Sequence, residues 1–262
     1  MQQAQLSPET ARNYIREGKI TSPTTGISLD YAQANLVILP KEAAYDFLVF
    51  CMRNPKSCPL LDVTEPGSPH PPLTAPSADL RTDLPRYHIY REGKLVDKTT
   101  SISDYWRDDL VSFLIGCSFS FEKSSLDQGI PVRQMEMGCN VPMYKTNIPC
   151  QPAGRFKGPL VVSMRPIPYN QVVRAVTTTS RFPNVHGAPV HIGSPDEIGI
   201  KDLSHPDYGD PVLIKEGEVP VFWACGVTPQ AVAAASGAEF MITHAPGHMF
   251  ITDIKDQSLS VF

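Results

Sequence analysis

The sequence contains little charge and no cluster of basic residues. Charged residues make up 19% of the 262 residues, and the formal net charge is −4 at pH 7. A nucleic-acid-binding protein needs a basic surface to meet phosphates, and a peripheral membrane protein needs one to meet anionic lipids. The sequence therefore supports neither partner. The low share of charged residues is compatible with a homodimer, because subunit interfaces are depleted of charge.

Long apolar segments and targeting signals are also missing. The chain has no run of about 20 apolar residues, which a membrane helix requires. Residues 1–18 lack the charged and then apolar pattern of a signal peptide. The six cysteines form no Cys-x-x-Cys pair, so a zinc ribbon and a thioredoxin motif are excluded. We therefore expect a cytoplasmic protein with reduced thiols.

Motifs for cofactors are absent as well. The sequence has no GxGxxG, no phosphate-binding P-loop and no G-x-S-x-G. His244 and His248 have a spacing that could bind zinc on a helix, but Pro246 and Gly247 lie between them and exclude a helix. Asp253 or Asp210 could complete a set of ligands, although nothing in the spacing places either of them there. We expect neither an organic cofactor nor a metal.

Proline, in contrast, is abundant, with 26 residues that mostly separate the expected elements. Residues 54–85 contain eight of them, and we predict a long ordered loop there, either functional or a subunit contact. Apolar periodicity and capping residues predict the remaining elements. We expect helices over 8–18, 40–53, 103–115, 169–180 and 228–236, strands over 35–39, 86–90, 94–96, 158–166, 189–192, 219–225, 239–243 and 249–254, and irregular structure over 130–157.

This order of elements predicts an α+β or α/β fold with a mixed β-sheet and flanking helices. We expect two intimately packed subdomains. Residues 1–155 would form a helical, loop-rich part with a small hairpin, and residues 156–262 a part built from βαβ-type units. Residues 158–193 and 219–254 both run strand, helix, histidine–proline turn and strand, which suggests an internal duplication. A different strand order in the two segments would contradict that hypothesis.

Four of the seven histidines lie in two short turns. The turns are His186-Gly-Ala-Pro-Val-His191 and His244-Ala-Pro-Gly-His248. Histidine readily serves as an acid, a base or a ligand near neutral pH. Taken singly, each imidazole could instead hold its turn by bonding to the backbone. We predict catalytic roles for His191, His244 and His248, and a substrate contact for His186.

Five other polar residues are candidates. Arg165 follows a buried strand and could clamp a carboxylate, or it could pair with a neighbouring acid. Glu122 and Glu136 lie among apolar residues, where a carboxyl group gains a raised pKa and can act as a general acid or base. Asp210 is a candidate for substrate binding. Cys117 precedes a short helix whose N–H groups could face an anion.

Two cysteines share a local pattern. Cys117 follows Gly116 and Cys225 precedes Gly226, each at the end of an expected element. A free cysteine is more often a small buried apolar residue than a reactive one. We favour that structural role for Cys225, and both roles stay open for Cys117.

Five long segments of the sequence together carry a resemblance to a known family. They are DDLVSFLIGCSFSFE (108–122), GPLVVSMRP (158–166), HGAPVHIGSPDEIGIKDLSHPDYGD (186–210), VPVFWACGVTPQ (219–230) and ITHAPGHMFITD (242–253). These segments resemble the YcsI-like family of bacterial hydro-lyases, which is similar to the N-terminal part of the mitochondrial D-glutamate cyclase. The resemblance covers nearly the whole chain.

The resemblance implies loss of water from a small amino or hydroxy carboxylate. For D-glutamate, the amine would attack the side-chain carboxyl group and give 5-oxo-D-proline. That reaction needs a base, an acid and a cation for the α-carboxylate. His191 or His244, Glu136 or Glu122, and Arg165 could fill these roles. The alternatives are a metal-dependent hydratase or hydrolase and a non-catalytic carboxylate-binding or regulatory protein.

Overall fold

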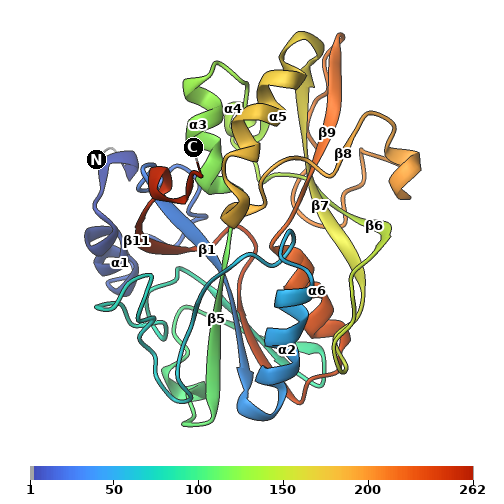
Figure 1. Cartoon of the computed structure of the whole chain (residues 1–262). Coiled ribbons are helices and arrows are strands. Elements are labelled where there is room, and N and C mark those ends of the chain that lie inside the picture. Colours follow the sequence, from blue (N-terminus) through green and yellow to red (C-terminus); the bar gives the residue numbers. More distant parts are fainter. Residues whose placement is uncertain (1–2, 262) are drawn as a thin grey trace.

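The computed structural model describes residues 3–261 and contains two antiparallel β-sheets (Figure 1). The larger sheet has the order β2 (Leu60–Val63), β5 (Leu110–Gly116), β1 (Tyr31–Pro40), β10 (Phe240–His244), β3 (Tyr87–Arg91) and β4 (Lys94–Thr99), and β11 (Phe250–Lys255) also pairs with β1. The smaller sheet has the order β6 (Met143–Pro149), β7 (Pro159–Pro168), β9 (Glu218–Ala224) and β8 (His191–Ile192).

Helices pack around these sheets, which confirms the α+β class. The first helix begins where its sequence predicts, because the hydroxyl oxygen of Ser7 accepts a hydrogen bond from the backbone N–H of Thr10. No helix within residues 3–261 is long and apolar enough to cross a membrane. The helices are α1 (Pro8–Arg16), α2 (Lys41–Arg53), α3 (Phe119–Asp127), α4 (Arg133–Met137), α5 (Val172–Ser180) and α6 (Val227–Ala235).

The expected helix over residues 103–115 is wrong. Only Ser103–Tyr105 forms a short 3-10 turn, and Leu110–Gly116 is strand β5, buried along its whole length. A strand covered on both faces is apolar at every position, so its sequence also satisfies the spacing of a helix face. The paired neighbours β1 and β2 decide the conformation here.

Residues 130–157 are more ordered than expected. They contain α4 and β6, and β6 pairs with β7 at one edge of the smaller sheet. Met143 and Tyr144 are adjacent and both buried, so the start of the strand lacks the alternation that marks a half-exposed strand. The interruption in its register with β7 weakens the pattern further.

Strand order also contradicts the duplication hypothesis. In the first segment, β7 and β8 both belong to the smaller sheet and both pair with β9. In the second segment, the chain leaves the smaller sheet after β9, passes through α6 and enters the larger sheet as β10. The two segments therefore share local pattern without sharing topology.

The two sheets share one hydrophobic core. Its largest cluster combines Val37 and Phe113 of the larger sheet with Val162 and Phe222 of the smaller one. Strands β10 and β11, from the C-terminal part of the chain, complete the larger sheet. Segments from both sides of residue 155 therefore pack against one another. A domain boundary at residue 155 stays a prediction.

Candidate functional site

Two strand–cysteine–helix units meet in the interior of the protein. Strand β5 ends at Gly116, Cys117 follows, and α3 begins at Phe119. Strand β9 ends at Ala224, Cys225 follows, and α6 begins at Val227. The first unit starts from the larger sheet and the second from the smaller sheet. The site candidate therefore lies where the two sheets approach each other.

Both cysteines line a buried cavity of about 30 Å³. This volume holds roughly two water molecules. Four of the lining side chains carry amide, hydroxyl or imidazole groups that suit a small acid, namely Asn35, Ser118, Asn140 and His244. The full lining is Asn35, Cys117, Ser118, Phe119, Asn140, Val141, Met143, Cys225, Gly226, Val227, His244, Pro246, Gly247 and Met249.

Asn35 on β1 holds the two units together. Its Nδ2 donates to the carbonyl oxygens of Ile115, at 3.2 Å, and Gly116, at 2.9 Å. The same side chain contacts the second unit so closely that a Cβ on Gly226 would lie 1.9 Å from Nδ2. Only glycine fits at position 226 without displacing Asn35. The residue before one cysteine and the residue after the other thus contact a single amide.

Burial and the neighbouring groups shift the pKa values of the two thiols in opposite directions. Burial raises the pKa of Cys117 well above its ordinary value and raises the pKa of Cys225 to about 11. The backbone N–H groups of Phe119 and Val227 donate to the respective sulfurs and lower these pKa values, as does the charge of Arg165. Burial outweighs these opposing influences, so both groups are neutral thiols at pH 7.

Arg165 on β7 is 3% exposed and is connected to the cavity through Ser118, which is one of the lining residues. Its Nη2 donates to Ser118 Oγ at 3.1 Å and to Glu122 Oε1 at 2.5 Å. The guanidinium group also lies over the rings of Phe121 and Trp223, 5.3 and 5.6 Å from their centroids. Its Nε has no hydrogen-bond partner. The predicted carboxylate clamp is thus engaged by an internal carboxylate and keeps one donor unused.

Glu122 on α3 is the partner of that arginine and is 3% exposed. Its Oε1 also accepts a hydrogen bond from Gln134 Nε2 at 2.7 Å. Burial raises the pKa of Glu122, and the attraction of Arg165 opposes this shift. The predicted acid is therefore a buried member of the arginine network, and Ser118 connects this network to the cavity.

His244 at the end of β10 is buried in the cavity wall. The backbone N–H of Leu36 donates to its Nδ1 at 3.0 Å, and the amide of Gln230 lies 3.1 Å from its Nε2. Burial lowers the pKa of His244 to about 3, so the ring is neutral at pH 7. The amide nitrogen of Gln230 also lies 2.6 Å from Nδ1. Both ring nitrogens thus contact neighbouring groups of the protein, which hold the neutral ring in one orientation in the cavity wall.

The structure places the other predicted histidines outside this cavity. His186 is buried, and its Nδ1 lies 2.9 Å from the carbonyl oxygen of Lys56. His248 Nδ1 lies 2.9 Å from the carbonyl oxygen of Pro246. His191 is on β8, with its Nε2 2.6 Å from the carbonyl oxygen of Ser194. Each imidazole bonds to the backbone of a turn or loop, as the structural alternative expected.

Two predicted acidic residues are also outside the cavity lining. Glu136 on α4 is exposed and forms an ion pair with Arg133 at 3.5 Å. Asp210 accepts the backbone N–H of Asn140 at 2.9 Å, which fixes the loop next to the cavity. Among residues 3–261, no group of three or more His, Cys, Asp and Glu side chains is arranged to hold a metal ion.

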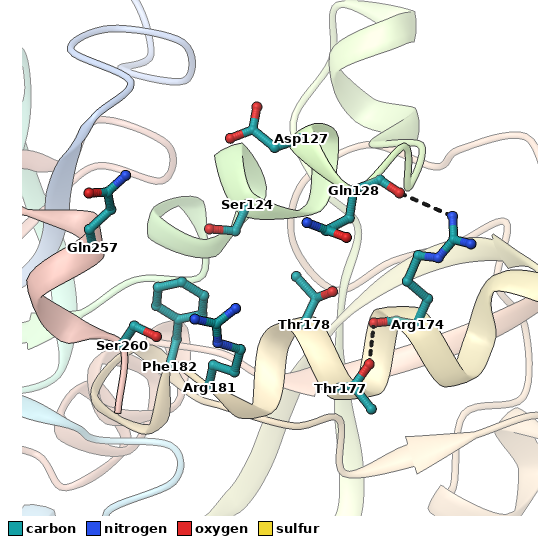
Figure 2. A pocket seen from close by; sticks show the side chains of 10 residues that line it. All are labelled: Ser124, Asp127, Gln128, Arg174, Thr177, Thr178, Arg181, Phe182, Gln257 and Ser260. Atoms are coloured by element: carbon teal, nitrogen blue, oxygen red, sulfur yellow. Dashed lines mark hydrogen bonds between the residues drawn. The ribbon is translucent and has the colours of Figure 1, made fainter. Parts of the chain in front are cut away.

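A larger hollow of about 590 Å³ opens at the surface between α3, α5 and the C-terminal segment (Figure 2). Arg174 and Arg181 lie along its floor on the α5 side, and Arg174 Nη1 donates to the carbonyl oxygen of Gln128 at 3.3 Å. Its lining includes the carboxylate of Asp127 but no histidine and no cysteine. The arginines of this hollow could bind an anion. Its lining lacks histidine and cysteine, which are the side chains that exchange protons near neutral pH.

Asn35 and Ser118 are site residues that the sequence analysis does not select. Cys225 is buried and packs in an apolar cluster with Val161 and Val227, which agrees with the structural role favoured for it, and it also lines the cavity. The available signal was the repeated sequence pattern of a buried strand, an adjacent glycine–cysteine pair and a helix. Two occurrences of this pattern indicate a pair of equivalent turns, whereas a single occurrence indicates only a packed thiol.

Comparisons with known proteins agree with the early resemblance. The profile of the family described as D-glutamate cyclase matches residues 111–253, which contain both cysteines, Glu122, Arg165 and His244. The Bacillus subtilis protein named "Putative hydro-lyase YcsI" is 62% identical, with 98% of this chain and 100% of that protein covered. A relative from Thermoanaerobacter pseudethanolicus with a hydro-lyase name of the same kind is 66% identical over 97% of this chain and 96% of its own length.

One solved structure was also compared. A nitrogen repressor-like protein from Methanococcus jannaschii covers 93% of this chain and 97% of its own, with 7% identity and a TM-score of 0.39. That score is too low to support an argument about fold or function. The family profile and the full-length relatives carry the assignment. This chain belongs to the D-glutamate cyclase family.

Proposed function

We propose that this protein is a hydro-lyase for a small amino or hydroxy carboxylate, and that its specific reaction is the cyclisation of D-glutamate to 5-oxo-D-proline and water. Family membership supports the reaction class. The observation that carries the proposal is the buried cavity, in which two helix N-termini, two thiols and a neutral imidazole meet beside Arg165.

Carboxylate binding is the first requirement. The N-termini of α3 and α6 carry partial positive charge and line the cavity, which favours an anionic group there. Arg165 adds a full positive charge, and its Nε still has a free hydrogen. A substrate as large as glutamate exceeds the 30 Å³ of the closed cavity, so the lining segments must separate when it binds.

Cyclisation then moves two protons from the amino nitrogen to the departing oxygen. Cys117 and Cys225 line the cavity as neutral thiols, so either can give a proton to the departing oxygen, and the thiolate that results can take up a proton from the amino nitrogen. The neutral imidazole of His244 lies in the wall of the same cavity, where a hydrogen bond from the ring to the carboxyl oxygen under attack would stabilise the tetrahedral intermediate. Glu122 is a positioning residue that aligns Arg165. Holding one folded conformer of the substrate supplies much of the rate enhancement.

Chiral chromatography tests this proposal directly. The purified protein is incubated with D-glutamate, L-glutamate, 5-oxo-D-proline and 5-oxo-L-proline, and all four compounds are quantified. We expect interconversion of the D pair, reduced by about 100-fold or more in Arg165→Ala and His244→Ala. Arg174→Ala, in the surface hollow of Figure 2, serves as the matched control and should keep full activity. Absence of turnover with all four compounds would reject the cyclase.

A further inference from the structure

We infer that the surface hollow of Figure 2 is part of a binding groove for a small phosphorylated sugar. Arg174 and Arg181 bind the phosphate, and the carboxyl groups of Asp30 and Asp256 bind the hydroxyl groups of the sugar. The inference does not depend on the proposed function, because no residue that lines the groove also lines the cavity of the candidate site.

Two neighbouring hollows form this groove. The hollow of about 590 Å³ is lined by the two arginines, and a second hollow of about 310 Å³ is lined by the two aspartates. Ser124, Asp127 and Gln257 line both, so the two hollows are contiguous. Sites for small organic ligands have volumes of roughly 300–1,000 Å³. A ligand the size of a sugar phosphate can therefore occupy one hollow and extend into the other.

The arginine end of the groove suits a phosphate group. Arg174 lies on α5 and Arg181 directly follows this helix, about two helical turns further on, so both extend from the same side towards α3 (Figure 2). Thr178 lies between them (Figure 2). The bond from Arg174 to the carbonyl oxygen of Gln128 uses only one of the N–H donors of its guanidinium group. Guanidinium groups bind phosphate through charge-assisted hydrogen bonds, and a phosphate monoester carries roughly two negative charges at pH 7.

The groove carries an excess of positive charge, although the chain as a whole has a net charge of −4. Lys123 forms an ion pair with Asp127 at 2.8 Å, so the charges of these two residues cancel. Burial raises the pKa of Asp256 to about 8, which leaves this carboxyl group mostly neutral at pH 7. The other charged residues of the lining are Arg174, Arg181, Lys255 and Asp30. Positive groups outnumber negative ones among them, which favours an anionic ligand.

An unpaired oxygen of Asp256 is an independent sign of a ligand. Asp256 is 5% exposed and lines the second hollow, yet its Oδ1 has no hydrogen-bond partner among residues 3–261. A buried oxygen without a partner costs free energy, and a hydroxyl group of a ligand would recover it. The backbone N–H of Asp256 donates to the carbonyl oxygen of Asp30 at 3.0 Å, which holds the two residues next to each other. Carboxyl oxygens in such a pair can accept hydrogen bonds from neighbouring hydroxyl groups of a sugar.

Isothermal titration calorimetry of the full chain, at constant ionic strength, tests the inference. The probes are ribose 5-phosphate, glucose 6-phosphate, inorganic phosphate, ribose and glucose. We expect at least one of the two sugar phosphates to bind about 10-fold or more tightly than inorganic phosphate, because the hydroxyl groups form additional hydrogen bonds to the carboxyl groups. The free sugars should show no measurable binding, since they lack the charged group that the arginines bind.

Substitutions at the two ends of the groove should have different effects. Arg174→Gln should weaken binding of the sugar phosphate and of inorganic phosphate by about 10-fold or more, because a charge-assisted hydrogen bond is lost. Asp256→Ala should weaken binding of the sugar phosphate by a similar factor and leave inorganic phosphate unchanged, which a general loss of structure would not produce. Arg155→Gln changes an exposed arginine outside the groove and, as the matched control, should bind like the wild type.

Three results would overturn the inference. The first is absence of binding by both sugar phosphates. The second is equal affinity for the sugar phosphates and inorganic phosphate, because the carboxyl end then contributes nothing. The third is unchanged affinity of Arg174→Gln, which would place the ligand outside the groove. Unfolding curves check that the variants are folded, and Asp30→Asn, at an exposed position, replaces Asp256→Ala if that variant does not fold.

Discussion

Arg165 and Glu122 form a buried ion pair next to the candidate site. Both side chains are at most 4% exposed, and Arg165 also contacts two aromatic rings. Removing a charged pair from water is expensive, and the pair offsets this only when both members are present. Nonpolar residues of similar size would pack here at no lower stability, so retention of the charges points to a function in binding.

Loss of one partner should therefore destabilise the fold strongly. We expect Arg165→Met to lower the free energy of unfolding by about 3–5 kcal/mol, because Glu122 is left buried and unpaired. The measurement is urea denaturation at pH 7. As a matched control, Lys123→Met breaks the more exposed pair with Asp127 and should cost less than about 1 kcal/mol. The double variant Arg165→Met/Glu122→Gln should regain part of the loss, and equal stabilities of the single and double variants would contradict this account.

Asp256 is a second residue whose burial has a measurable consequence. It is 5% exposed, its Oδ1 has no hydrogen-bond partner, and burial raises its pKa to about 8. The raised pKa means that its contribution to stability is present below about pH 4, the ordinary pKa, and is lost as the pH rises towards 8. We expect Asp256→Asn to be more stable than the wild type by about 5 kcal/mol at pH 8.

The same substitution should have little effect at pH 4, where the carboxyl group is already neutral. Denaturation curves at both pH values check this difference. An equal effect at pH 4 and pH 8 would show that the ionisation of Asp256 is not the cause.

At the scale of elements, the repeated strand–cysteine–helix unit is the feature that builds the site. In each unit, a short turn joins the end of a strand to the start of a helix. The first N–H groups of that helix have no partner within the helix, and the sheet holds them in place. Two such turns from different sheets face one cavity, and Asn35 on β1 connects them. The orientation of both thiols therefore depends on the close contact at Gly226.

Substitution of that glycine should disturb both units together. Gly226 has ordinary helical dihedral angles, so alanine adds no backbone strain there. Its Cβ would instead collide with Asn35 Nδ2 and break the bonds to Ile115 and Gly116. We expect Gly226→Ala to destabilise by about 2 kcal/mol and to lower turnover by at least about 10-fold.

Removing the Asn35 side chain tests whether its collision with the new Cβ causes these losses. The double variant Asn35→Ala/Gly226→Ala should be no less stable than Asn35→Ala alone, because the colliding group is gone. Thermal unfolding and the chromatographic assay give both readouts. Additive losses in the double variant would contradict the proposed contact.

For the whole molecule, buried neutral histidines predict sensitivity to acid. Burial lowers the pKa of His186 to about 4 and that of His244 to about 3. Their contribution to stability is complete above about pH 6.5 and is lost as the pH falls towards these values, because the unfolded chain binds the protons first. Asp256 acts in the opposite direction. We expect a net loss of roughly 1–3 kcal/mol per pH unit below pH 6.

Urea denaturation at pH 7, 6 and 5 measures this loss. His186→Gln should flatten the dependence, since one of the titrating groups is removed. A free energy of unfolding that is constant over this range in Asp256→Asn would contradict the account, because only the histidines then remain as the dominant titrating groups.

Local signals in the sequence predicted most elements but not their pairing. The Ser7 cap, the buried face of α2 and the strands near residues 162, 222 and 242 follow from capping and periodicity. The prediction for the residues of strand β5 was wrong, because a strand that is buried on both faces has no alternation of polar and apolar residues. Its neighbours in the sheet determine its conformation. The antiparallel order of both sheets also depends on contacts between distant residues, which local pattern does not encode.

The site was predicted only in part for the same reason. The sequence by itself determined the family, the apolar segments, and the presence of Cys117, Glu122, Arg165 and His244 near the ends of elements. Only the tertiary structure decided that Cys225 joins them and that the other three histidines do not. Residue types and spacing fix local conformation, whereas the meeting of two distant turns depends on how the two sheets pack into one core.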